Sequence, residues 1–332
     1  WSRIPYNPGP DVAPVKRHWE CMMIWDNLKN SLLADLQQRI EERADPADRV
    51  SLSNLSDELY RRFAAEDMRG RTVENLYGCL YSLLRLMREW DGTAPKVVFS
   101  NPEVQRDGWE SGNTVLMILC RGIPFITASV RGEINRRNLP IHVIGSTNIE
   151  VQRDGQGRLQ AILAPDDEIS DDCSSEALVY FELGRHSQPE DLDELRDTLL
   201  EILAEVALVV DDFPAMNERL EAVAEIIRGS ECVEKELREE AVAFLLWLRQ
   251  QHMTMLGYEY LKVEQKGAHA VVSTCPDTRL GLLRNRDTRG PADLEADLAS
   301  MNLEEMHRKQ LSFSKSRQRS RVHRLTYPDY VE

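Results

Sequence analysis

Histidines, cysteines and acidic residues are the side chains whose spacing could build a reactive site in this sequence of 332 residues. The seven histidines are scattered, and His142 alternates with Ile141 and Val143, which is the pattern of a strand rather than of a catalytic site. The six cysteines are also far apart and form no C-x-x-C pair, which argues against a zinc ribbon or a thioredoxin-type site. Several cysteines lie in apolar stretches, so we expect reduced, buried thiols.

The densest acidic cluster is PDDEISDDCSSE, residues 165–176. Oxygen-rich loops can bind Ca²⁺, but this one lacks the ligand order and the central glycine of an EF-hand, so we expect a solvated loop. The GQG of residues 155–157 falls in a hairpin-type turn rather than a strand-to-helix turn, and the sequence contains no Walker loop, G-x-S-x-G or H-E-x-x-H. We therefore expect no catalytic, cofactor-binding or metal-binding residues in this chain.

The formal net charge is −15, whereas proteins that bind nucleic acids or anionic membranes are normally basic on at least one face, so we expect neither partner. One basic stretch, RKQLSFSKSRQRSRVHR at residues 308–324, allows a phosphate-binding patch, although a solvated strand or loop face is the expectation. No apolar run approaches the length of a transmembrane helix, and together with the cysteine usage this predicts a cytoplasmic protein. The first residue is Trp1 rather than Met, so we expect a piece of a longer protein.

Amphipathic helices are predicted for the N-terminal region, after an aperiodic arm at residues 1–20. Apolar residues recur at helical spacing in residues 22–43 and from Leu76 to Met87, and the DGTAP of residues 91–95 ends the last of these helices. The β-rich stretches KVVF and TVLMILC follow, then a helix whose first turn suits Pro124, and then strands, a hairpin turn and a long helix.

These patterns divide the chain into four regions. They are an N-terminal arm and helical region, a first α/β domain, a helical connector, and a second α/β domain whose end we expect to be missing: residues 1–92, 93–212, 213–256 and 257–332. The helical regions need partner surfaces to cover their apolar stripes.

Five blocks in a fixed order resemble the amino-terminal part of the large bacterial NAD-specific glutamate dehydrogenases. They are KVVFSNPEVQRDGWESGNTV (96–115), IPFITASVRGEINRRNLPIHVI (123–144), FLLWLRQQHMTMLGYEY (244–260), LGLLR (280–284) and KSRQRSRVHRLTYPDY (315–330). Two positions depart from the family pattern, Asn113 where it has His and Ala128 where it has Asp. The resemblance implies an α+β fold of ACT-like (ferredoxin-like βαββαβ) modules with antiparallel sheets, joined and flanked by amphipathic helices.

The resemblance also implies a function. In that family the catalytic dehydrogenase domain lies further along the polypeptide, so this chain is expected to hold no catalytic site and no cofactor, with NAD bound in the parent enzyme's catalytic domain. ACT-type domains of other proteins pair and bind amino acids. We therefore expect a regulatory and assembly segment whose partners are its own catalytic domain, other subunits of a homo-oligomer and an amino-acid effector. The alternative is a purely structural oligomerisation scaffold that binds no effector.

In ligand-binding ACT-type domains, the corner between the first strand and the first helix holds the amino acid, because backbone N–H groups at a helix start suit a carboxylate. Here that corner is GIPFI, where Pro124 removes one donor and Phe125 places a ring in the ligand's space. We therefore expect Phe125 to pack against the core or a partner domain, with effector binding at this corner as the alternative. The resemblance implies that the residues at this contact are Gly122, Pro124, Phe125 and Ser129.

Overall fold

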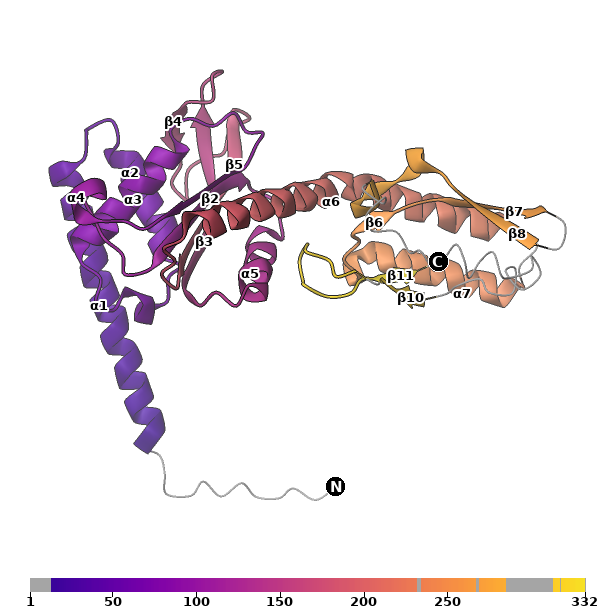
Figure 1. Cartoon of the computed structure of the whole chain (residues 1–332), viewed down its shortest axis with the longest axis horizontal. Coiled ribbons are helices and arrows are strands. Elements are labelled where there is room, and N and C mark those ends of the chain that lie inside the picture. Colours follow the sequence, from indigo (N-terminus) through magenta and orange to yellow (C-terminus); the bar gives the residue numbers. More distant parts are fainter. Residues whose placement is uncertain (1–12, 232–233, 267–268, 285–312, 317, 332) are drawn as a thin grey trace. The chain divides into compact units, whose positions relative to one another are not determined.

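The computed structural model describes residues 13–231, 234–266, 269–284, 313–316 and 318–331 (Figure 1). The chain forms two compact units, which are described separately below. The first unit holds residues 1–122 and 139–196, and the second holds residues 123–138 and 197–332. Within the described residues, no helix combines the length and the apolar character that crossing a membrane requires.

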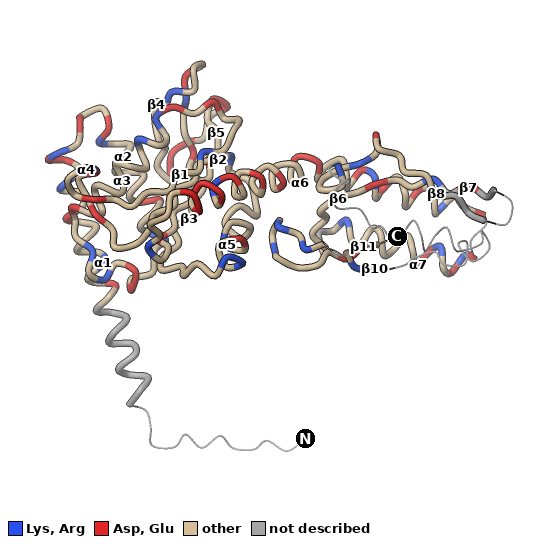
Figure 2. The backbone as a smooth tube through the Cα atoms, viewed as in Figure 1, with Lys and Arg blue, Asp and Glu red and all other residues tan. Residues whose placement is uncertain are grey.

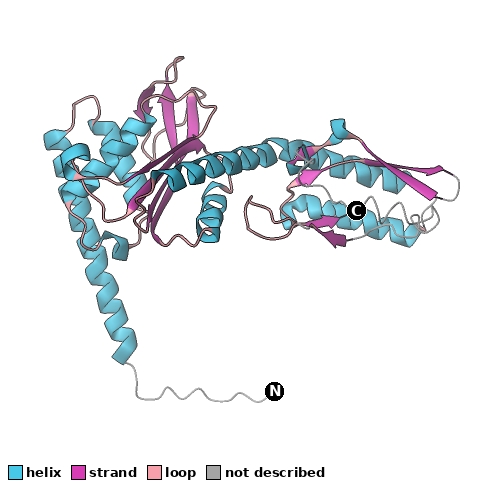
Figure 3. Ribbon diagram, viewed as in Figure 1, coloured by secondary structure: helices cyan, strands magenta, loops and turns pink. Residues whose placement is uncertain are grey.

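The first unit contains an antiparallel sheet, whose strands are magenta in Figure 3. Its five strands lie in the order β1-β2-β5-β3-β4. The strands are β1 Lys96–Ser100, β2 Thr114–Arg121, β3 Ile141–Arg153, β4 Leu159–Ile162 and β5 Cys173–Leu183. The apolar run of β2 and the second half of β5 are buried on both faces, which explains why these segments are apolar without alternation. The predicted hairpin turn joins β3 to β4, and the side chain of Asp154 accepts hydrogen bonds from the N–H groups of Gln156 and Arg158 there.

The expected α+β class with an antiparallel sheet is confirmed, and one strand has an unexpected origin. Along the chain, β2, α5 (Ile126–Arg136), β3, β5 and α6 (Pro189–Gly229) follow the expected βαββα order. The sheet edge beside β2 is formed by β1, which precedes this series. An upstream strand therefore completes the sheet, instead of the last strand of the βαββαβ pattern.

The helices of the first unit pack on one another and on this sheet around one apolar core. They are α1 Ala13–Arg43, α2 Arg49–Tyr60 and α3 Val73–Met87, with a 3-10 helix at Ala65–Met68 and a single turn, α4, at Val104–Asp107. The predicted stripe of α3 is at most 2% exposed: Leu76, Leu80, Leu83, Leu84 and Met87. The expected arm at residues 1–20 is wrong for its second part, because α1 begins at Ala13 and Pro14 is tolerated in a first helical turn. Residues 1–12 lie outside the described residues.

Trp109 anchors the loop between β1 and β2 on α3. Its side chain is 3% exposed, and its Nε1 donates a hydrogen bond of 3.0 Å to Ser82 Oγ. A Cβ on Gly78 of α3 would lie 2.5 Å from the Cβ of Trp109, so only a glycine lets the two segments approach this closely. Trp109 is thus a packing residue between this loop and α3.

The second unit contains α5, the part of α6 from residue 197 onward, and α7 (Lys235–Trp247), which continues as a π-helical turn at Leu248–His252. Ala224, Val242, Leu245 and Leu248 form the apolar contact between α6 and the α7 segment. Helix α6 runs without a break through Pro214, so the domain boundary expected at residue 212 falls inside it.

The C-terminal region of the second unit forms three two-stranded antiparallel sheets within its described residues. They pair β6 (Gly257–Tyr258) with β9 (Leu280–Gly281), β7 (Leu261–Lys266) with β8 (His269–Thr274), and β10 (Phe313–Lys315) with β11 (Asp329–Val331). A 3-10 helix at Pro276–Thr278 lies between β8 and β9.

Asp212 fixes β9 to α6. Its carboxylate accepts hydrogen bonds from Arg284 Nε at 2.6 Å, from Arg284 Nη2 at 2.7 Å and from the Gly281 N–H at 2.7 Å. The hydrogen bonds from Arg284 lower the pKa of Asp212. Strand β9 and the arginine that follows it are thus joined to α6 through one carboxylate.

Four cysteines in the described residues are free thiols: Cys79, Cys120, Cys173 and Cys275. Burial raises the pKa of Cys79 to about 11 and that of Cys120 to about 12. These two thiols are therefore protonated and unreactive at neutral pH.

Candidate functional site

The corner between β2 and α5 has an unusual backbone. Phe125 precedes the first residue of α5 and has a left-handed φ of 74°, a conformation that side chains other than Gly, Asn or Asp rarely adopt. The expectation that Pro124 lies in the first helical turn is wrong, because the helix begins at Ile126, beyond this bend. Gly122 donates its N–H to the Ser175 carbonyl at 2.8 Å, and a Cβ on Gly122 would come within 2.7 Å of Ser175 Oγ.

A segment from the far end of the chain covers the start of α5. This segment is Ser320–Thr326, which we name the strap. The backbone N–H of His323 donates a 2.9 Å hydrogen bond to Ser129 Oγ. The His323 imidazole lies against the Phe125 ring, with centroids 4.8 Å apart and planes inclined by 56°. Ser129 is only 2% exposed, and its hydroxyl accepts this hydrogen bond from the chain itself.

The strap is a tight loop held by its own backbone. Ser320 N–H donates to the Thr326 carbonyl at 2.8 Å, and the N–H of Val322 donates to Ser320 Oγ at 3.0 Å. Val322 is 0% exposed and Ser320 is 3% exposed. His323 has a left-handed φ of 65°, so both residues of the Phe125–His323 contact have strained backbones. The Nδ1 atom of His323 is buried and has no hydrogen-bond partner among the described residues.

An ion pair anchors the strap to α6. The Arg321 guanidinium donates to Glu205 Oε1 at 2.5 Å and to Glu201 Oε2 at 3.1 Å. These two acids are one turn apart on a helix that carries many acidic residues (Figure 2). Burial alone would lower the pKa of Arg321, but the two carboxylates outweigh burial and raise it. Arg321 therefore stays charged, and part of the basic stretch of residues 308–324 serves an internal contact.

Helix α5 carries a buried charge, Glu133, one turn after Ser129. The Glu133 side chain is 1% exposed and accepts hydrogen bonds from Arg136 and Arg137 at 2.6–2.9 Å. Burial would raise the pKa of Glu133, but the two arginines hold it below its ordinary range. Arg137 also donates to Thr198 Oγ1 on α6 at 3.0 Å, which joins α5 to α6.

The structure brings together two of the four residues expected at the corner. Phe125 and Ser129 meet at the strap, whereas Gly122 and Pro124 shape the bend before them. Sequence reasoning missed His323 and Arg321 as members of this site. The signal available for them was the RVHR of the last family-like block, which gives no indication of where in the chain its partners lie.

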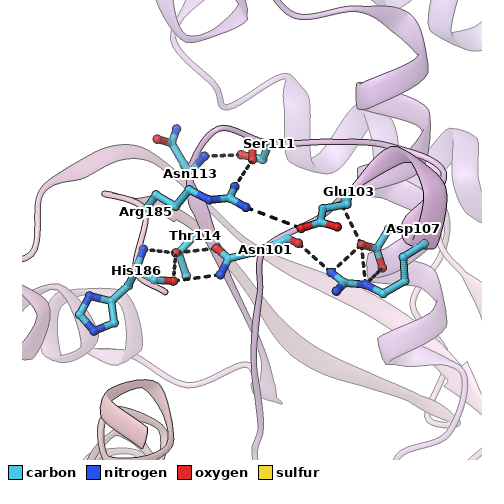
Figure 4. A network of polar contacts seen from close by, with 9 residues as sticks. Asn101, Glu103, Asp107, Ser111, Asn113, Thr114, Arg185 and His186 are labelled. Carbon is cyan, nitrogen blue, oxygen red and sulfur yellow. Dashed lines mark hydrogen bonds and ion pairs between the residues drawn. The ribbon is translucent and has the colours of Figure 1, made fainter. Parts of the chain in front are cut away.

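A second polar cluster lies where β1 and β2 meet the loop after β5 (Figure 4). Asn101 Nδ2 donates to the His186 carbonyl at 2.9 Å, and Thr114 Oγ1 donates to Asn101 Oδ1 at 2.8 Å and accepts from the His186 N–H at 2.8 Å. Arg185 donates to the Ser111 carbonyl at 3.0 Å. Backbone groups take most of these contacts, so the cluster closes a sheet end rather than forming a reactive site.

Metal chemistry finds no support in the described residues, which contain no group of three or more His, Cys, Asp or Glu placed to hold an ion. In the acidic stretch 165–176, residues 165–172 are exposed, as expected of a solvated loop. Glu176 instead pairs with Arg153 in the interior, at 2.6 Å. A shallow pocket in the second unit is lined by Pro276, Asp277, Arg279 and Arg284, and both arginines are already paired with Glu259 and Asp212.

The sequence of the chain is similar to that of known proteins. Residues 55–199 match a family model described as the ACT1 domain of glutamate dehydrogenase. The chain is 32% identical over 303 residues to an NAD-specific glutamate dehydrogenase of Halomonas elongata, and 32% identical over 308 residues to one of Pseudomonas aeruginosa. These alignments cover 90% and 92% of this chain but only 19% of each relative.

Proposed function

We propose, from the match of residues 55–199 to the glutamate dehydrogenase ACT1 domain model, that the chain is the N-terminal regulatory and assembly segment of an NAD-dependent glutamate dehydrogenase. The parent enzyme would convert L-glutamate, NAD and water to 2-oxoglutarate, ammonia and NADH. The observation that carries this proposal is 32% identity along 90% of the chain to an enzyme of that name. In this proposal, the catalytic site and the NAD site lie in the remainder of the parent polypeptide, and the enzyme is cytoplasmic.

The regulatory part of the proposal rests on the corner before α5. The first turn of a helix offers backbone donors to a carboxylate, which supports the proposal that an amino-acid effector binds there. Phe125 and Ser129 are the side chains that such an effector would meet, with Gly122 and Pro124 shaping the approach. The proposed partners are the parent's catalytic domain and other subunits of a homo-oligomer.

A scaffold without effector binding is the second candidate, and one observation favours it. The strap covers Ser129, and its His323 ring lies against Phe125, so the corner is filled by the chain itself. In that case the ACT-like architecture serves assembly alone.

A thermal unfolding experiment with free amino acids at millimolar concentration separates the two candidates. A ligand present at about 100 times its Kd adds about 2.7 kcal/mol to the free energy of unfolding, which is readily measured as a rise in Tm. We expect a rise for one or two amino acids and none for the rest. If no amino acid raises the Tm and the chain associates in a concentration-dependent way, the scaffold is supported instead. Production of NADH from glutamate and NAD by this chain alone would contradict both.

A further inference from the structure

We propose that the strap, Ser320–Thr326, is a releasable latch. In the closed state it covers Ser129 and Phe125 at the start of α5. In the open state both residues are uncovered, while the sheet of the first unit stays folded. The strap and the residues that it covers all lie in the second unit, and the inference does not depend on the assignment to glutamate dehydrogenase.

The first argument is how little apolar surface holds the strap closed. Val322 is its one fully buried apolar side chain, while Arg324 and Thr326 are exposed and Leu325 is half-buried. Its contacts at the start of α5 include the hydrogen bond to Ser129 and the ring contact to Phe125, which lies just before the helix. A segment with few buried apolar contacts opens at a lower free energy than a core strand.

The second argument is that the closed state carries identifiable costs. Phe125 and His323 both have left-handed backbones, which release of the contact would allow to relax. The buried Nδ1 of His323 has no hydrogen-bond partner within the described residues, and it would regain water on opening. Strain on both sides of this contact lowers the free energy that opening requires.

The third argument is that an ion pair supplies the main polar anchor. Arg321 pairs with Glu205, whose side chain is 10% exposed, and with Glu201, whose side chain is 66% exposed. The pair is therefore partly open to solvent, and dissolved salt weakens it. The latch should open more readily as the ionic strength rises.

Hydrogen exchange of the whole chain, followed by mass spectrometry, tests the latch. We expect Arg321→Ala to raise the exchange rates of residues 126–132 and of residues 320–326 together, by roughly tenfold, because the anchor is lost. The matched control is Arg319→Ala, since Arg319 lies over the Tyr327 ring of the same region and its loss leaves the anchor intact. Exchange of β2 should be the same in the wild-type chain and both variants.

Salt gives a second readout that a merely structural role would not produce. Between about 0.05 M and about 1 M salt, exchange of both segments should rise in the wild-type chain and in Arg319→Ala, but not in Arg321→Ala, where the anchor is already gone. Ser129→Ala should raise exchange of residues 320–326 and add little in combination with Arg321→Ala. Unchanged exchange of residues 126–132 in Arg321→Ala, or equal loosening of β2, would overturn the proposal.

Discussion

At the scale of single residues, Glu182 is a buried carboxylate that accepts hydrogen bonds from three side chains. It accepts hydrogen bonds from Arg71 Nη1 at 2.7 Å, Tyr180 Oη at 2.6 Å and Asn113 Nδ2 at 3.0 Å, while its side chain is 6% exposed. Burial would raise the pKa of Glu182, but the hydrogen bond and charge of Arg71, with the bonds from Tyr180 and Asn113, hold that pKa below its ordinary range. The carboxylate ties the loop before α3 to the end of β5.

Glu182→Gln should lower the free energy of unfolding of the first unit by about 3 kcal/mol, because the Arg71 charge then stays in a largely buried place without its partner. Urea unfolding followed by tryptophan fluorescence measures this loss, since Trp90 and Trp109 are buried in that unit. The double variant Arg71→Met with Glu182→Leu should lose less than Glu182→Gln, because both charges leave together. A single variant as stable as the wild type would show that the pair is dispensable.

The same carboxyl predicts how stability depends on pH. A group whose pKa is lower in the folded chain stabilises the fold fully above its unfolded pKa, about 4.3 for glutamate, and this contribution is lost as the pH falls through the lower folded pKa. The free energy of unfolding of the first unit should therefore fall on acidification below about pH 4. In Glu182→Gln this fall should be smaller. Identical acid profiles for the two chains would count against the assigned pKa.

At the scale of elements, two helical glycines predict opposite outcomes. Gly78→Ala places a Cβ 2.5 Å from Trp109, so it should cost about 1–3 kcal/mol of stability even though alanine is the better helix former. Gly132→Ala on α5 meets nothing within 4 Å and should stabilise its helix by up to about 1 kcal/mol. Urea unfolding of both variants checks the signs. Destabilisation of similar size in both would mean that Trp109 moves aside at little cost.

The elements themselves were largely predictable from local pattern. The stripe from Leu76 to Met87 predicts α3 because periodic burial is a local property, and the RDGQG turn predicts the hairpin for the same reason. The corner was predicted less well. A left-handed φ normally calls for Gly or Asn, and nothing local indicates that Phe125 adopts it or that its ring contacts His323. The edge position of β1 also could not be predicted, because pairing order is set by distant strands.

At the scale of the whole molecule, charge and the proposed assembly role act against each other. A net charge of −15 makes copies of the chain repel one another. We therefore expect self-association to strengthen between about 0.05 M and about 0.5 M salt, as screening shortens the range of that repulsion. Sedimentation velocity over a range of concentrations measures this. A single monomeric species at every salt and concentration would contradict the proposed homo-oligomer.

The candidate site joins segments that are far apart in the chain. Sequence reasoning therefore found Phe125 and Ser129 but missed Arg321 and His323. Ser129 and His323 are 194 positions apart, and no periodicity or spacing links them. The family-like blocks marked both segments as noteworthy but did not pair them. Such long-range contacts depend on how α5, α6 and the strap pack together, and only the three-dimensional structure shows that packing.

The distance in sequence between Ser129 and the strap also has a consequence in time. A ribosome adds roughly 5–20 residues per second, so the start of α5 emerges roughly 10–40 s before His323 does. During that interval every newly made chain has an uncovered corner, whatever the equilibrium of the finished protein. A chaperone or small molecule that recognises the exposed Phe125 ring thus meets it first on the nascent polypeptide, and slow translation between residues 129 and 320 would lengthen that encounter.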